Sequence, residues 1–291
     1  MNISIVGPGK VGTTLALALR RKGFHIASVI GRTKTRARHC AELVSCDRYS
    51  HRSADIHPQT DLLVLATPDS VIKAVAEEAA RHTSLRFNRL KVFHVSGVLT
   101  SDVLSPLTER GALCFSLHPI QTFAGGRTPT ERPLSLKGIS YGFEGASRAE
   151  RFARRLVREL DGKLLVIPKE EKILYHIACV FASNYLLTAL QPAEEIGDRL
   201  KWKTLAPFGA LITQTIANAQ DPDVAQALTG PIVRGDVDTV KAHIHELRRS
   251  CPELLPLYRE LGLRTAIIAQ RTRRNRRKEL ASIRKILSQR P

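Results

Sequence analysis

The chain has 291 residues, enough for two domains, and 43% of them are hydrophobic, which excludes an intrinsically disordered protein. Its five scattered cysteines form no Cys-x-x-Cys pair, which excludes a disulfide framework, predicts no metal centre and is typical of a cytoplasmic protein. The net charge of +18 suits anionic ligands, but residues 271–291, with nine basic residues and one acid, carry +8 of it. The charge therefore does not by itself indicate a nucleic-acid-binding protein.

The first predicted elements are a strand, a glycine turn and a helix. Residues 2–6 form a short apolar run rich in β-branched side chains, the turn reads GPGKVG from Gly7 to Gly12, and residues 11–19 have a helical pattern. In a dinucleotide-binding unit, the first glycine permits the turn, the second lets the backbone approach a pyrophosphate, and the third lets helix and strand pack closely. The phosphates then bind at the helix N-terminus. The stretch therefore predicts a dinucleotide site in a Rossmann-type domain.

The second predicted strand, residues 24–30, leads to Arg32, which predicts the cofactor. NAD-binding units place an acid about 20 residues beyond the glycines, where it bonds the ribose 2′-hydroxyl. Arg32 takes that place here, and a guanidinium can pair with a 2′-phosphate. We therefore expect NADP, contacted by Arg32 and Thr33. Lys34 and Arg36 are either helpers or solvated residues of the next helix.

Three further strands are predicted over residues 61–66, 90–95 and 112–117, and each ends in a polar turn. Ligands of a parallel sheet bind beyond the carboxyl ends of its strands, so these turns should lie near the cofactor. Asp69 reads as the N-cap of the helix that follows the first of them. The residues expected at the site from these turns are Thr67, Pro68, Ser96, Gly97, His118 and Gln121.

The pattern changes from α/β to helical near Pro168. Residues 125–133 read as a loop, either a lid or a plain surface connection, and strands are predicted at 139–143 and 163–167. Long helices are predicted over residues 169–196, 204–219, 237–249 and 254–271.

The expected fold class is α/β, an N-terminal parallel sheet followed by an all-α domain. The expected domains are an NADP-binding domain (1–168), a helical substrate and dimerisation domain (169–270) and a basic tail (271–291). The tail is predicted to be a solvated helix or disordered end, with a contact to nucleic acid or a membrane surface as the alternative.

Residues 173–191 contain no charged residue, yet their polar side chains make them a poor membrane span, and we expect a helix buried on most sides. On this helix Lys172, His176 and Ser183 fall within about 40° of each other, whereas Asn184 lies about 120° from Lys172 and about 18 Å from it along the axis. Lys172 and His176, one turn apart, can therefore serve one reacting centre. The alternative for His176 is a hydrogen-bonded core histidine.

Residues 228–236 join two predicted helices by a turn dense in glycine, proline, hydroxyl and charge. Arg234 in this turn suits a substrate carboxylate. Alternatively, Arg234 and Asp236 pair with each other and cap the following helix.

Several spaced motifs together resemble one family. GPGKVG, VSGVLTSDVL, SLHPIQTF, KILYHIACVFASNYLLTAL and LTGPIVRGDVDTVKAHI look like the Rossmann-like proteins with a DUF2520 C-terminal domain, over about residues 2–269. These are similar in plan to pyrroline-5-carboxylate reductase and to the 6-phosphogluconate and 3-hydroxyisobutyrate dehydrogenases, whose helical domains form dimers. The resemblance implies the fold, NADP and a homodimer, but not the substrate. The β-hydroxyacid dehydrogenases place an asparagine four residues after a catalytic lysine, whereas His176 follows Lys172 here, so their mechanism is not carried over.

We therefore expect a cytoplasmic NADP(H)-dependent oxidoreductase that transfers a hydride to or from a small anionic carbonyl, hydroxyl or imine compound. The expected cofactor site comprises Gly7, Pro8, Gly9, Lys10, Val11, Gly12, Arg32, Thr33, Thr67, Pro68, Ser96 and Gly97. His176 or Lys172 would supply or accept the proton, His118 and Asn184 would orient the substrate, and Gln121, Ser183 and Arg234 would bind it, Arg234 from the partner subunit. The alternatives are an NADP-responsive binding or scaffold protein without turnover and, from His118-Pro119 alone, a prephenate-dehydrogenase-like oxidation. Neither nucleic acid nor a membrane is an expected partner.

Overall fold

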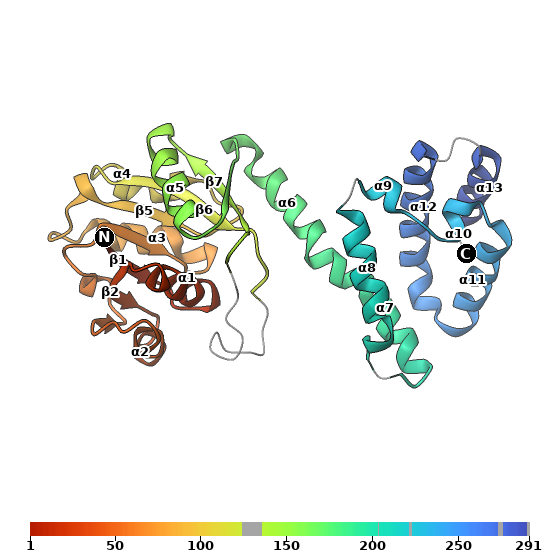
Figure 1. The fold of residues 1–291 in the computed structure, drawn as a ribbon, viewed down its shortest axis with the longest axis horizontal. Coiled ribbons are helices and arrows are strands. Elements are labelled where there is room, and N and C mark those ends of the chain that lie inside the picture. Colours follow the sequence, from red (N-terminus) through yellow and green to blue (C-terminus); the bar gives the residue numbers. More distant parts are fainter. Residues whose placement is uncertain (124–135, 203, 221–222, 273–275, 290–291) are drawn as a thin grey trace. The chain divides into compact units, whose positions relative to one another are not determined.

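Figure 1 shows the computed structural model of the chain, which describes residues 1–123, 136–202, 204–220, 223–272 and 276–289. The chain divides into two compact units, Met1–Asn184 and Tyr185–Pro291, so the first unit extends beyond the predicted boundary at Pro168. The loop predicted at residues 125–133 and residues 273–275 of the predicted tail lie outside the described residues.

The first unit is built on a sheet of eight described strands in the order β3-β2-β1-β4-β5-β6-β7-β8. Neighbouring strands are parallel except β6 and β7, which are antiparallel. The bounds are β1 Asn2–Val6, β2 His25–Ile30, β3 Tyr49–Ser50, β4 Leu62–Leu65, β5 Lys91–His94, β6 Leu113–Pro119, β7 Ser140–Gly145 and β8 Lys163–Val166. This order and direction confirm the predicted Rossmann-type sheet.

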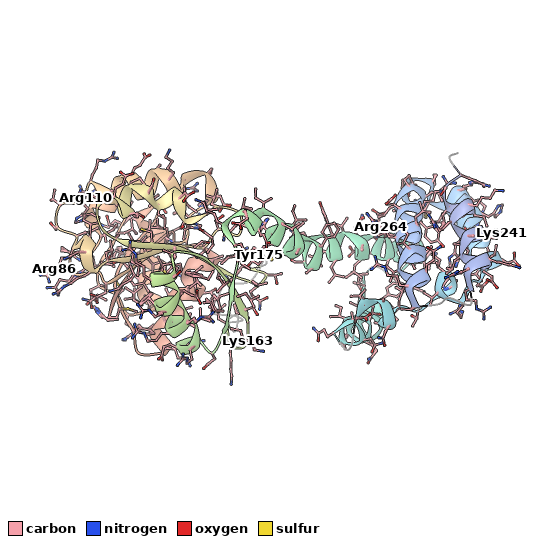
Figure 2. All side chains as sticks on the ribbon, turned by 90° about the horizontal axis from the view of Figure 1, so that it is seen from above. Arg86, Arg110, Lys163, Tyr175, Lys241 and Arg264 are labelled. Carbon is pink, nitrogen blue, oxygen red and sulfur yellow. The ribbon has the colours of Figure 1, made fainter. Side chains whose placement is uncertain are left out.

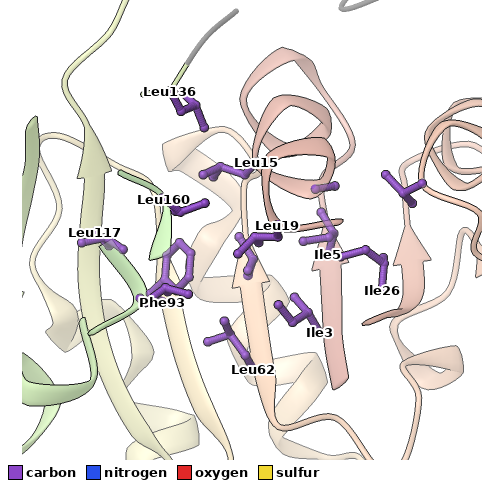
Figure 3. Packing of buried hydrophobic residues seen from close by; sticks show 14 of the residues in the cluster. Ile3, Ile5, Leu15, Leu19, Ile26, Leu62, Phe93, Leu117, Leu136 and Leu160 are labelled. Atoms are coloured by element: carbon purple, nitrogen blue, oxygen red, sulfur yellow. The ribbon is translucent and has the colours of Figure 1, made fainter. Parts of the chain in front are cut away.

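Helices cover both faces of this sheet. Their bounds are α1 Lys10–Arg21, α2 Lys34–Leu43, α3 Asp69–Ala80, α4 Ser105–Thr108 and α5 Ser147–Glu159. The last helix of this unit, α6 Lys172–Ala182, contributes no residue to the two buried clusters of the sheet faces. Ile3 and Ile5 of β1 pack in one buried cluster with α1, α2 and α5, whereas Val6 belongs to the other cluster with α3 and α4. Successive strand side chains point to opposite faces, which is why adjacent residues of β1 enter different clusters. Figure 3 shows the first of these clusters.

The second unit is helical. Its elements are α7 Asn184–Arg199, whose first residue closes the first unit, α8 Gly209–Ala219, α9 Val224–Ala227, α10 Pro231–Arg234, α11 Val237–Ser250, α12 Leu255–Thr272 and α13 Arg277–Leu287. Leu280, Ile283 and Leu287 of α13 are at most 2% exposed and pack with α10, α11 and α12. The prediction of a solvated or disordered tail is therefore wrong for residues 277–287, because one apolar face of this basic helix completes the core.

The apolar stretch after Pro168 differs from its predicted form in two ways. The predicted helix over residues 169–196 is broken at Ser183 (φ −131°, ψ −73°), between α6 and α7. Within the described residues, 169–199 is a helical stretch long and apolar enough to cross a membrane, and none of its most apolar window is buried. The prediction of a helix buried on most sides is therefore wrong for the single chain.

Candidate functional site

The three glycines of the first turn have three different environments. Gly7 has a φ of +94°, and a Cβ there would lie 2.6 Å from the carbonyl carbon of Ala66 on the neighbouring chain segment. A Cβ on Gly12 would overlap the carbonyl oxygen of Gly7, so the start of α1 packs directly on the turn. Gly9, by contrast, has nothing within 4 Å of a Cβ position. The backbone at Gly9 is therefore open, as a bound pyrophosphate requires.

The start of α1 fits an anionic ligand. Gly9 is its N-cap, no side chain caps the free backbone N–H groups, and the first turn contains no acid. Such an end attracts negative charge through its N–H groups and the helix dipole. Thr67, just beyond β4, has a buried hydroxyl without a hydrogen-bond partner among the described residues. The open N-terminus and this orphaned hydroxyl agree with a dinucleotide at the carboxyl edge of the sheet.

Arg32 lies two residues after the end of β2 and is exposed. Among the residues that the structure describes, no carboxylate forms an ion pair with it. Thr33 caps α2, because its hydroxyl accepts from the backbone N–H of Arg36 at 3.4 Å. Lys34 lines a shallow hollow beside β3 together with Arg48, His51 and Arg52, and with Asp47 and Asp55. The lining of this hollow therefore combines three basic side chains with two carboxylates, and Asp55 pairs with Arg52.

The turns after β4 and β5 are joined by their side chains. Ser96 donates its hydroxyl proton to Asp69 Oδ2 at 2.8 Å and accepts from the backbone N–H groups of Val98 and Leu99 at 3.1 and 3.0 Å. The prediction that Asp69 caps α3 is wrong, since Pro68 is the N-cap and Asp69 binds Ser96 instead. The Ser96 side chain thus shapes its own turn, and Gly97, the next residue of the turn, is buried.

Two imidazoles flank Gly97. A Cβ on this glycine would overlap His176 Cδ2 and would lie 3.1 and 3.2 Å from Cε1 and Nε2 of His118. His118 belongs to β6, which continues to Pro119, so it lies within a strand rather than at the predicted exit. Burial lowers the pKa of His118 to about 4, and the charge of Lys172 acts in the same direction. His118 is therefore neutral at pH 7.

Lys172 is buried close to Gly97, His118 and His176. Its side chain is 1% exposed, and its ammonium donates to Ser116 Oγ at 2.6 Å and to the carbonyl oxygen of Ser96 at 3.3 Å. Burial lowers its pKa to about 8. Because its ammonium donates to Ser116 within β6 and to Ser96 just beyond β5, Lys172 fastens α6 to this part of the sheet. This placement favours an indirect role over direct proton exchange with a substrate.

The other predicted site residues are not gathered around Gly97 by any described contact. Gln121 is exposed, and its Oε1 accepts from the backbone N–H of Thr122. Ser183 lies at the break between α6 and α7, followed by the exposed Asn184. Arg234 is exposed at the end of α10 in the second unit. Their predicted roles remain predictions.

Asp236 caps α11, as expected in the alternative interpretation of residues 228–236. Its carboxylate accepts from the backbone N–H and the hydroxyl of Thr239 at 3.1 and 2.7 Å, which starts α11. These hydrogen bonds lower the pKa of Asp236.

Sequence reasoning missed Tyr175. Its hydroxyl forms a hydrogen bond of 2.7 Å with Nδ1 of His118, and Figure 2 labels it on α6. The available signal was its spacing: Tyr175 follows Lys172 by three residues and therefore shares its face of the helix. Its partner on β6 is 57 positions away in the sequence and could not be deduced from spacing.

Comparisons with known proteins support this description. Residues 1–119 match a Rossmann-like domain, and residues 139–265 match a domain of unknown function, DUF2520. Glycerol-3-phosphate dehydrogenase (NAD(P)+) from Syntrophotalea carbinolica is 24% identical over 196 residues, which cover 64% of this chain and 52% of that protein. The chain thus spans about half the length of this curated relative.

Three solved structures share the fold. Protein TM1727 from Thermotoga maritima is 26% identical with a TM-score of 0.72, covering 93% of this chain and 99% of that one. BF3122 from Bacteroides fragilis, a proposed NADP oxidoreductase, is 24% identical with a TM-score of 0.72, covering 91% and 97%. An imine reductase from Myxococcus stipitatus in complex with NADP+ is 15% identical with a TM-score of 0.57, covering 99% and 93%. The chain therefore combines a Rossmann-like domain over residues 1–119 with a DUF2520 domain over residues 139–265, as its sequence motifs predict.

Proposed function

We propose that the chain is an NADP(H)-dependent oxidoreductase of a small anionic carbonyl, hydroxyl or imine compound. The observation that carries the proposal is the open glycine turn at the start of α1, together with Arg32 beyond the next strand, which pairs with no described carboxylate. The named activities of the relatives support this class of reaction: one is a dehydrogenase of NAD(P)+, one is a proposed NADP oxidoreductase and one is an imine reductase in complex with NADP+. None of them identifies the substrate.

The residues around the turn hold the cofactor. Gly9 and the N–H groups that open α1 receive the pyrophosphate, and Arg32 pairs with the 2′-phosphate. Thr67, Pro68 and the backbone of Gly97 line the ribose and nicotinamide at the ends of β4 and β5. When bound, the nicotinamide supplies or accepts the hydride.

The two imidazoles beside Gly97 act on the substrate, one in proton transfer and the other in orientation. His176 supplies or accepts that proton, and neutral His118 orients the substrate by a hydrogen bond. Lys172 acts indirectly, by holding Ser96 and Ser116 in place.

A substrate screen tests this proposal. NADPH oxidation is followed with 2-oxo acids, aldehydes and cyclic imines, and NADP+ reduction with hydroxy acids. We expect turnover in one of these classes, and we expect His176→Asn to lose at least 100-fold in kcat while it binds NADPH as the wild type does. NADPH binding without turnover in every class would contradict the enzyme and favour a binding or scaffold protein.

A homodimer completes the proposal. Leu174, Ile177 and Phe181 are 66, 45 and 64% exposed and lie on the face of α6 away from Lys172 and His176, and Ile173, 62% exposed, borders this face. A contiguous apolar face of this kind marks an interface, and two copies can cover it by self-complementary packing. With its five cysteines free, the protein is assigned to the cytoplasm in this proposal.

Oligomeric state in solution tests this interface. We expect the wild type to sediment as a dimer and Ile177→Glu as a monomer, because a carboxylate in an apolar interface loses its hydration without gaining a partner. Val71→Glu, at an exposed apolar position on α3, serves as the matched control and should remain dimeric. A monomeric wild type that binds lipid vesicles would show that a membrane surface covers this face instead.

A further inference from the structure

We propose that Tyr175 is a positioning residue that holds His118 as a neutral imidazole with its proton on Nε2, beside Gly97. The role assigned to that proton, a hydrogen bond to the substrate, rests on the proposed function. The arrangement of the two side chains stands independently, because it follows from contacts within the first unit.

The pair is built into the fold by a glycine. Tyr175 Oη lies 2.7 Å from His118 Nδ1, and the two rings are nearly perpendicular at 83°. On β7, Gly142 is the antiparallel partner of His118, and a Cβ at Gly142 would overlap the tyrosine hydroxyl. The absence of a side chain at Gly142 thus leaves space for this hydroxyl next to Nδ1. Any larger residue at position 142 would displace it.

The direction of the hydrogen bond follows from the chemistry of the two groups. Burial raises the pKa of Tyr175, so the phenol keeps its proton and donates it. The neighbouring acceptors are His118 Nδ1 and the thiol sulfur of Cys179, and sulfur is the weaker acceptor. Nδ1 therefore accepts the phenol proton. A neutral imidazole that accepts at Nδ1 carries its own proton on Nε2.

The Nε2 atom lies where a substrate would need it. A Cβ on Gly97 would approach Nε2 to 3.2 Å, so this edge of the ring adjoins the turn proposed to line the nicotinamide. Among the described residues, Tyr175, His176, Lys172 and His94 are the titratable groups that interact with His118. The charges of His176 and Lys172 lower its pKa. His176 and Lys172 thus disfavour a charged imidazole, so His118 remains a hydrogen-bond donor of fixed orientation.

Nitrogen-15 NMR of the imidazoles in the full-length protein tests the inference without any substrate. The His118 signals are assigned by their loss in His118→Asn. In the wild type we expect one neutral tautomer, protonated on Nε2, down to a pH near 4. In Tyr175→Phe we expect a mixture of tautomers and a higher pKa of His118, because the lost hydrogen bond had stabilised the neutral form.

The chain offers a matched control in a second pair of the same kind. Tyr258 Oη lies 2.9 Å from His243 Nδ1 on the exposed surface of the second unit. Tyr258→Phe should change the His243 signals and leave those of His118 unaltered. Gly142→Ala should reproduce the effect of Tyr175→Phe at His118, and it provides the test if the phenylalanine variant does not fold.

Two results would overturn the inference: a wild-type His118 protonated on Nδ1, or a tautomer unchanged in both Tyr175→Phe and Gly142→Ala. Once a substrate is known, Tyr175→Phe should lower kcat about 10-fold or more with the KM for NADPH unchanged. Failure of the substrate screen alone would leave the tautomer result standing, which separates this inference from the proposed function.

Discussion

Gly9→Ala is expected to fold as stably as the wild type and to bind NADPH at least 100-fold more weakly. Gly9 has φ −79° and ψ −165°, which alanine adopts without strain, and its Cβ would meet no protein atom within 4 Å. In the proposed complex that space belongs to the pyrophosphate. An added methyl group would remove about two charge-assisted hydrogen bonds, each contributing about 1.5–3 kcal/mol.

Calorimetric titration with NADPH and thermal unfolding measure the two effects separately. Gly209→Ala is the matched control, since a Cβ there also meets nothing within 4 Å but lies at the start of α8 in the second unit. Gly12→Ala should show the opposite pattern, a lowered melting temperature, because its Cβ overlaps the carbonyl oxygen of Gly7. Gly9→Ala that binds NADPH within threefold of the wild type would show that no pyrophosphate lies there.

Arg32→Ala is expected to weaken NADPH binding about 10- to 100-fold and to leave NADH binding nearly unchanged. The physical reason is the loss of a guanidinium that pairs with the 2′-phosphate, a charge-assisted contribution of about 1.5–3 kcal/mol that NADH cannot use. Since no described carboxylate pairs with Arg32, its removal leaves no buried charge without a partner. NADH therefore acts as an internal control in the same titration.

Arg38→Ala is the matched variant for this experiment. Arg38 is an exposed arginine on α2 whose guanidinium pairs with Glu42 at 2.7 Å. Its replacement should change neither affinity by more than about twofold. Equal losses in Arg38→Ala and Arg32→Ala would attribute the effect to general positive charge rather than to the position after β2.

The Rossmann-type unit could be predicted because its signals are local. Apolar runs such as residues 62–65 are long enough to identify buried strands, and the spacing from Gly12 to Arg32 can be counted directly. The two-residue strand β3 is too short to produce a pattern. Helical spacing also predicted that Lys172 and His176 share one face of α6. It did not predict which residues that face contacts.

Three features needed tertiary information. In α13 the basic composition concealed Leu280, Ile283 and Leu287, whose helical spacing completes the second core. In α6 the apolar residues predicted burial, but composition does not distinguish a face covered by its own chain from one covered by a partner. The hydrogen bond between Tyr175 and His118 depends on the missing side chain of Gly142, which no local pattern reveals.

In the proposed function, the sheet edge beside Gly9 and Arg32 is an NADP(H) site. Calorimetric titration of the wild-type protein with NADPH and with NADH, under one set of buffer conditions, tests this claim. We predict that NADPH binds at least 10-fold more tightly than NADH. Equal affinity for the two cofactors, or no binding of either, would contradict the claim.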